Sequence, residues 1–186
     1  GAVAAKYLSR QSSETAGVIG TGVQAKAQIE VLTEVRSLKR LFAFSQDTQA
    51  KREQFAESVE RDAGLAVKLA PTARDAVENA EILVTATNST KPVVRGEWLV
   101  PGQHITSMGA DDSMKVELAP EVFQRADRLI IDYEKALTTR QLRVPLDSGQ
   151  LTEDSIHGTI GDVVVGKTQG RTRDDEITVF QSTGMS

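Results

Sequence analysis

A short glycine turn near the start of the chain has the residue types needed to hold a phosphate. The turn is Gly20-Thr21-Gly22-Val23-Gln24-Ala25, and it joins the apolar run Ala16-Gly17-Val18-Ile19 to a helix-forming stretch. Gly20 permits a sharp turn, Gly22 has no side chain to block the phosphates, and Ala25 lets the helix approach the strand. The first N–H groups of that helix and the positive end of its dipole would face the anion. Strand, turn and helix in this order predict a dinucleotide site, with a purely structural turn as the alternative.

The residue that binds the adenosine ribose is expected about 20 residues after the glycine turn, at the end of the second strand. There Phe44 is followed by Ser45-Gln46-Asp47, so that Asp47 lies slightly late for this role. A carboxylate accepts hydrogen bonds from a free 2′-hydroxyl, whereas a 2′-phosphate favours arginine and repels an acid. Because this tip contains no arginine, the sequence favours NAD over NADP. Ordinary loop roles for these three residues are the alternative.

Two carboxylates follow the expected fifth strand. Asp111 and Asp112 come soon after the strand predicted at 103–108, on the carboxyl side where open parallel sheets bind ligands. A carboxylate with a tuned pKa can give and take protons beside a reacting carbon. The alternative is that both acids cap a helix that begins near Ser113.

The elements that position these residues alternate along the chain. Strands are expected at 16–19, 38–44, 65–69, 81–86, 103–108, 128–132 and 177–180, helices at 1–10, 23–35, 48–63, 71–79 and 153–165, and a loop at 145–150. This order predicts an α/β fold, a doubly wound and mostly parallel Rossmann-like sheet with helices on both faces. The sequence begins inside a helix and stops just after a strand, so a fragment of a longer protein is expected.

Composition narrows the classes of partner. The chain has 186 residues, which suits one domain, and a net charge of −4 with acids and bases interspersed. It offers no extended basic surface for nucleic acid and no apolar run of the roughly 18 residues that span a membrane. The absence of cysteine excludes disulfides and fits a cytoplasmic location. His104 and His157 are expected to be structural, with His157 on a helix, and no His, Asp and Glu cluster has the spacing of a metal site.

Four stretches together resemble the ornithine cyclodeaminase and mu-crystallin family. They are 17–25, 81–94, 101–118 and 170–184, of which the last two are specific to the family rather than general to nucleotide-binding folds. The resemblance implies that residues 1–186 are the dinucleotide-binding domain of a longer enzyme, a homodimer whose second domain contacts the substrate. It implies hydride exchange between NAD(P) and the Cα of a small amino acid or imino acid, by cyclodeamination, oxidative deamination or imine reduction. The alternative is a crystallin-type binding protein without significant turnover.

The resemblance also assigns site residues. Asp111 matches the catalytic aspartate of the family, and Lys115 matches a position that contacts the cofactor. Ser113-Met114 stands where the family usually has Pro-Gly, which leaves the loop shape and the substrate subclass open. Further cofactor contacts are implied at three strand ends: Thr85, Ala86 and Thr87 beside the adenine-ribose half, and Thr106, Ser107, Met108 and Ser182 on the nicotinamide side. Hydroxyl groups at such positions also cap helices, which is the alternative role.

Overall fold

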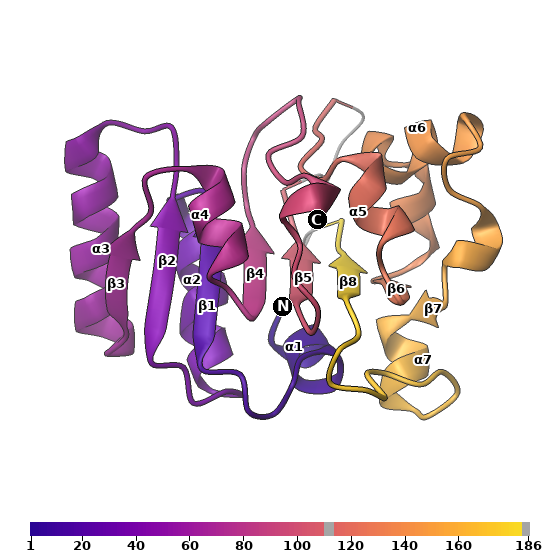
Figure 1. Cartoon of the computed structure of the whole chain (residues 1–186), viewed down its shortest axis with the longest axis horizontal. Helices are drawn as coiled ribbons and strands as arrows, with labels where there is room; N and C mark the ends of the chain where they lie inside the picture. The colour runs from indigo at the N-terminus through magenta and orange to yellow at the C-terminus, as the bar shows by residue number, and fades with distance from the viewer. Residues whose placement is uncertain (110–113, 184–186) are drawn as a thin grey trace.

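The strands form a single parallel sheet. The structure is a computed structural model that describes residues 1–109 and 114–183. Within those residues the strand order is β3-β2-β1-β4-β5-β8-β6-β7 (Figure 1). The strands are β1 (Thr15–Ile19), β2 (Arg40–Phe44), β3 (Ala66–Leu69), β4 (Ile82–Thr85), β5 (His104–Ser107), β6 (Arg128–Ile131), β7 (Gly158–Thr159) and β8 (Thr178–Gln181).

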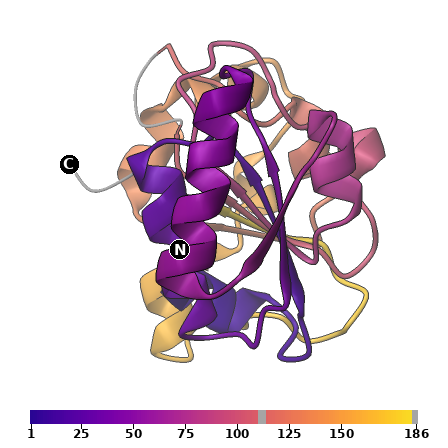
Figure 2. The same cartoon turned by 90° about the vertical axis from the view of Figure 1, so that its left-hand side faces the viewer.

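Helices cover both faces of this sheet. The α-helices are α1 (Ala2–Leu8), α2 (Val23–Thr33), α3 (Gln49–Ala63), α4 (Ala73–Glu78), α5 (Pro120–Gln124), α6 (Arg140–Asp147) and α7 (Ile160–Val164), and the 3-10 helices are η1 (Gly96–Trp98), η2 (Glu134–Thr138) and η3 (Glu153–Ser155). Helices α1, α2, α3 and α7 lie on one face, and α4 and α5 lie on the other (Figure 2). None of the helices in the described residues is long and apolar enough to cross a membrane.

Alternate residues of the central strands build two separate cores. Val18 and Val84 pack with the side chains of α2 and α3, whereas Ile19 and Leu83 pack on the opposite face with residues of α4 and α5. Because both faces are covered, every position of such a strand tolerates an apolar residue, and the strands appear in the sequence as short continuous apolar runs. The predicted doubly wound, mostly parallel, Rossmann-like fold is confirmed.

The strand order reverses at β1. From β1 the chain builds outward to β2 and β3, and it then returns to place β4 and β5 on the other side. Connections from the carboxyl ends of β1 and β4 therefore leave in opposite directions and open a crevice between them. The glycine turn follows β1, so the topology places the predicted phosphate site at this crevice.

Two predictions about the C-terminal third are wrong. The loop expected at 145–150 begins inside a helix, because Pro145 is a buried residue of α6. The single helix expected at 153–165 is instead η3, β7 and the short α7, and His157 lies between η3 and β7. The sequence also gave no prediction of α5 or of the first half of α6.

The apolar spacing that suggested one helix comes from two cores. Ile156 packs against the core that contains Leu129, whereas Ile160 packs against the core that contains Ile130 on the opposite face of β6. Gly158 lies between them with φ +136°, a backbone conformation that ends any helix. Spacing along the chain alone does not distinguish one amphipathic helix from a segment that crosses the edge of a sheet.

Candidate nucleotide-binding site

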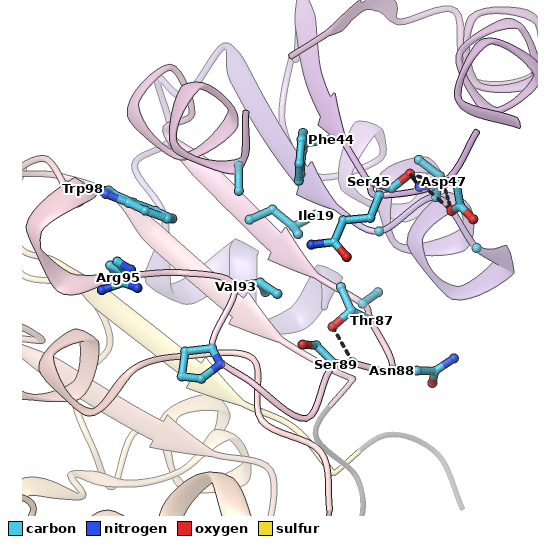
Figure 3. Close-up of a pocket in the computed structure, with 17 residues that line it drawn as sticks. Ile19, Phe44, Ser45, Asp47, Thr87, Asn88, Ser89, Val93, Arg95 and Trp98 are labelled. Atoms are coloured by element: carbon cyan, nitrogen blue, oxygen red, sulfur yellow. Dashed lines mark hydrogen bonds between the residues drawn. The ribbon is translucent and has the colours of Figure 1, made fainter. Parts of the chain in front are cut away.

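A cavity of about 600 Å³ opens at the carboxyl ends of β1, β2 and β4. Its walls come from the glycine turn, the tip after β2, the segment after β4 and the region of η1. In Figure 3, Ser45 and Asp47 lie at one end, and Arg95 and Trp98 lie at the other. The volume is in the range of small-molecule sites, and the position is the crevice where open α/β sheets bind ligands.

The two glycines of the turn meet different surroundings. Gly20 has φ +108°, and a Cβ there would collide with the carbonyl oxygen of Ala86, so the fold itself requires glycine. Gly22 has φ −84° and ψ 179°, which any residue adopts. A Cβ on Gly22 would meet no atom within 4 Å. The missing side chain at Gly22 is therefore not needed for folding, and it leaves the space beside the helix open to a ligand.

The first turn of α2 is ready to bind an anion. The helix has no side-chain cap at its N-terminus and no acidic residue in its first turn. Its first backbone N–H groups have no partner within the helix and carry the positive end of the dipole. Val23 and Gln24 contribute such N–H groups, but their side chains do not line the cavity. Ala25 is fully buried, as close packing of helix on strand requires.

A carboxylate lies at the tip after β2. The Thr21 hydroxyl donates to Asp47 Oδ2 at 2.8 Å, and the Ser45 hydroxyl lies 3.2 Å from the same oxygen (Figure 3). The hydrogen bond from Thr21 is the main cause that holds the pKa of Asp47 below its ordinary value. Asp47 is therefore charged at neutral pH, and Thr21 links it to the glycine turn.

Apolar and cationic groups that sequence reasoning did not assign to a site complete the cavity. Ile19, Phe44, Val93 and Trp98 line it, and Trp98 also packs against the adjoining core. Apolar side chains of this kind suit a flat aromatic ring. Arg95 adds a cation. Ile19 and Phe44 already meet as partners on the paired strands β1 and β2. Val93, Arg95 and Trp98 join them only when the segment that follows β4 folds back over the strand ends.

The structure brings one group of predicted site residues together and separates another. Around the cavity lie Gly20, Thr21, Gly22, Ser45, Gln46, Ala86 and Thr87. The residues that do not line it are Val23, Gln24, Thr85, Thr106, Ser107, Met108, Lys115 and Ser182. The candidate catalytic residue, Asp111, lies outside the described residues. Among the residues that the structure describes, no group of three His, Asp or Glu side chains is arranged to hold a metal ion.

Three of the predicted hydroxyls point into the protein. Thr85, Thr106 and Ser107 are fully buried. The Thr85 and Ser107 hydroxyls donate to Glu117 Oε2 at 2.7 and 2.9 Å, and the Thr106 hydroxyl lies 3.0 Å from His104 Nε2. Any contact of these residues with a ligand in this arrangement would come through the backbone.

Comparison with known proteins agrees with this geometry. The sequence profile of the ornithine cyclodeaminase/mu-crystallin family matches residues 1–186. The chain belongs to this family. It is 37% identical over 186 residues to an alanine dehydrogenase of Archaeoglobus fulgidus, a match that covers 100% of this chain and 56% of the relative. The chain thus spans just over half the length of the relatives that it matches.

Solved structures of relatives share the fold and contain the dinucleotide. The Δ1-pyrroline-2-carboxylate reductase of Thermococcus litoralis, in complex with NADH and L-proline, superposes with a TM-score of 0.94 at 34% identity, covering 98% of this chain and 57% of that one. An archaeal alanine dehydrogenase dimer with bound NAD superposes with a TM-score of 0.91 at 35% identity, covering 99% of this chain and 56% of that one.

Proposed function

We propose that this chain is the NAD-binding domain of an oxidoreductase that exchanges hydride with the Cα of a small amino acid or imino acid. The observation that carries the proposal is Gly22. A Cβ there would meet no atom within 4 Å, and Gly22 lies between a cavity and the N-terminus of α2, which has no side-chain cap. Family membership and the NADH and NAD bound in related structures support the same function.

The residues around the cavity suit the parts of NAD. The glycine turn and the first N–H groups of α2 would hold the pyrophosphate, and the apolar residues Ile19 and Phe44 would contact the adenine side. The charged Asp47 would accept a hydrogen bond from a ribose 2′-hydroxyl and repel a 2′-phosphate, so we propose NAD as the preferred cofactor. When bound, NAD supplies the nicotinamide that accepts or donates hydride.

Proton transfer is assigned to Asp111, which matches the catalytic aspartate of the family. Loss of ammonia, addition of water and reduction of an imine all need a group that moves protons beside the reacting carbon. Lys115, Ser182 and the backbone at 106–108 are proposed on the nicotinamide side. We expect the whole protein to be a dimer, as the archaeal alanine dehydrogenase is. The sequence of this chain selects no single amino acid and no direction of reaction.

A nucleotide titration of matched glycine variants tests the proposal. Gly22→Val should lower the melting temperature only slightly, because a Cβ there meets no atom within 4 Å and the only cost is a less favourable N-cap residue. It should raise the Kd for NADH by about tenfold or more, which corresponds to about 1.4 kcal/mol. Gly161→Ala is the control, because Gly161 likewise lies at the start of a helix and a Cβ there would make only an ordinary contact.

The same titration distinguishes the two cofactors. Wild-type protein should bind NADH more tightly than NADPH, and the difference should shrink in Asp47→Asn. Equal NADH affinity of wild type and Gly22→Val would contradict the assignment of the turn to the pyrophosphate. Binding of NADH without turnover of any amino acid by the whole protein would favour a binding protein instead.

A further inference from the structure

A fully buried carboxylate that does not line the cavity joins the ends of two strands. Glu117 is 0% exposed. Its Oε2 accepts hydrogen bonds from the Thr85 hydroxyl at 2.7 Å, the Ser107 hydroxyl at 2.9 Å and the Gly109 N–H at 2.8 Å. Its Oε1 accepts the N–H of Thr87 at 2.6 Å. Burial of a charge without compensation is costly, and here four donors compensate it.

These donors come from the carboxyl ends of neighbouring strands. Thr85 and Thr87 belong to β4 and the residues just after it, and Ser107 and Gly109 stand in the same relation to β5. Thr87 also lines the cavity. A Cβ on Gly109 would collide with the backbone of Thr87 and with the carboxylate of Glu117, so the strand ends are closely packed. Glu117 therefore bonds to the wall of the cavity on the side that faces the protein interior.

The backbone of Glu117 is itself fixed by a buried amide. Gln141 of α6 accepts, through Oε1, the N–H of Glu117 at 2.6 Å and that of Leu118 at 3.0 Å. Its Nε2 donates to the Leu118 carbonyl oxygen at 2.7 Å. Leu118 also forms a parallel bridge with Val94. The carboxylate therefore has a fixed direction before any ligand binds.

We propose that Glu117 is a positioning residue for nucleotide binding, which holds the cavity wall at Thr87 in the geometry that the dinucleotide needs. It acts through the N–H of Thr87 and makes no contact of its own with the cavity. Holding a wall in its bound geometry lowers the cost of binding, because the protein does not have to select a minor conformation first. The inference rests on the proposed binding of NAD.

The chemistry of the four donors makes one substitution selective. A carboxylate has only acceptors, whereas the amide of Glu117→Gln has one oxygen and one NH₂ group. The hydroxyls of Thr85 and Ser107 can rotate and accept from that NH₂ group, but a backbone N–H cannot. Whichever way the amide turns, the N–H of Thr87 or that of Gly109 faces another donor. The variant keeps the size of the side chain and breaks one backbone anchor, either that of Thr87 itself or that of Gly109, whose backbone packs closely against Thr87.

Glu176 offers a matched control at the other end of the sheet. It is 1% exposed and lies before β8, at the amino edge. Its oxygens accept the N–H of Thr172 and the hydroxyl of Thr172, both at 2.7 Å. An oxygen of Glu176 also lies 3.8 Å from Nε of Arg128. Glu176→Gln makes the same chemical change in an equally buried site and also removes the ion pairs with Arg128 and Arg173, so it should destabilise the fold at least as much.

The experiment compares NADH binding in whole protein containing wild-type chain, Glu117→Gln or Glu176→Gln. Fluorescence titration is done below the melting temperature of all three proteins, and thermal unfolding is recorded beside it. Both variants should melt at a lower temperature. Only Glu117→Gln should raise the Kd for NADH, by about tenfold, because the loosened wall must be brought back to its bound geometry when the nucleotide binds.

The outcomes separate this inference from the function on which it rests. If wild-type protein fails to bind NADH, the proposed function is overturned and this inference with it. If wild-type protein binds NADH and the Kd of Glu117→Gln is no higher than that of Glu176→Gln, only the positioning role is overturned.

Amide hydrogen exchange in wild-type protein tests the same role without a variant, in case Glu117→Gln does not fold. The N–H groups of Thr87 and Gly109 should exchange slowly before NADH is added. Rapid exchange that slows only after NADH is added would overturn the role.

Discussion

Gly20 and Gly22 meet different physical requirements although they lie two residues apart. Gly20 is fixed by the fold, through its positive φ and its contact with the carbonyl group of Ala86. Gly22 is free of both constraints, so neither backbone strain nor close packing requires glycine there. The same separation applies to hydroxyls: Thr21 points to Asp47 at the cavity, whereas Thr85 points to Glu117 in the interior. A residue type at a strand end therefore does not by itself identify a ligand contact.

At the same scale, Asp111 is predicted to transfer protons. Asp111→Asn in the whole protein keeps the size of the side chain and removes the base, so the turnover rate should fall about a hundredfold or more. The Kd for NADH should change little. Steady-state kinetics and a nucleotide titration measure the two effects.

Asp112→Asn is the matched control for this prediction, and its turnover rate should change much less. Asparagine caps a helix about as well as aspartate. Full activity of Asp111→Asn would therefore support the cap and reject the proton-transfer role.

At the scale of elements, a buried histidine connects β5, β8 and α1. His104 is fully buried, with Nδ1 2.9 Å from the Thr178 hydroxyl and Nε2 3.0 Å from the Thr106 hydroxyl. The Thr178 hydroxyl donates its proton to the Leu8 carbonyl oxygen at 2.8 Å. His104 must therefore donate from Nδ1, and in the neutral ring Nε2 accepts from the Thr106 hydroxyl. Burial, reinforced by the charge of Arg171, lowers the pKa of His104 to about 3.

This pKa predicts a loss of stability in acid. The unfolded chain protonates His104 below the ordinary pKa of about 6.5, whereas the folded chain does not until about pH 3. The contribution of neutral His104 to the free energy of unfolding is complete above pH 6.5. It is lost at about 1.4 kcal/mol per pH unit as the pH falls from 6.5 to about 3. The wild-type free energy of unfolding should therefore fall, relative to that of His104→Gln, by about 2 kcal/mol between pH 7 and pH 5.

Urea unfolding of both proteins at pH 7, 6 and 5 measures this change. His157→Gln, at an exposed position, is the control for a general effect of losing a histidine. Parallel pH profiles of wild type and His104→Gln would contradict the neutral buried state.

At the scale of the whole molecule, two arginines attach the first helix to the sheet. Arg36 is buried and donates to the carbonyl oxygens of Ala5, Lys6 and Ser9 at 2.8, 3.0 and 3.1 Å. Arg171 donates to the carbonyl oxygen of Leu8 at 2.8 Å. These groups pair the carbonyl groups of Lys6 and Leu8, which the end of α1 leaves without helical partners, and supplement the Ser9 N–H that already donates to Ala5. A helix of 7 residues, too short to be stable alone, is thereby made part of the nucleotide-binding unit.

We therefore expect the isolated 186-residue chain to fold and bind NADH but to show almost no turnover. Its two cores and the proposed nucleotide cavity lie within the described residues. The chain spans only 56% of the related alanine dehydrogenase, and the substrate contacts are expected in the remainder. Circular dichroism, an NADH titration and an assay with alanine, proline and ornithine measure the three properties. Turnover by the isolated chain at a normal enzymatic rate would contradict this division of roles.

The sequence by itself determined the order of the elements and the position of the glycine turn. Strand, turn and helix follow one another without a gap from Ala16 onward, so local propensity and spacing were sufficient to predict them. The tip at Ser45 and Asp47 follows directly from the same unit, because β2 pairs with β1 in parallel and brings its end to the turn. Predictions succeeded where neighbours in the sequence are also neighbours in the structure.

Only the tertiary structure decided which residues share an environment across the chain. Glu117 meets Thr85 and Ser107 because β4 and β5 end side by side, and no local pattern connects a glutamate with a threonine 32 residues earlier. Trp98 reaches the cavity because the segment after β4 folds back over the strand ends. Ile156 and Ile160, which share the spacing of one helix, lie in different cores because the chain crosses the sheet edge between them. The order of the strands in the sheet determines which of these residues come into contact, and that order cannot be derived from spacing along the sequence.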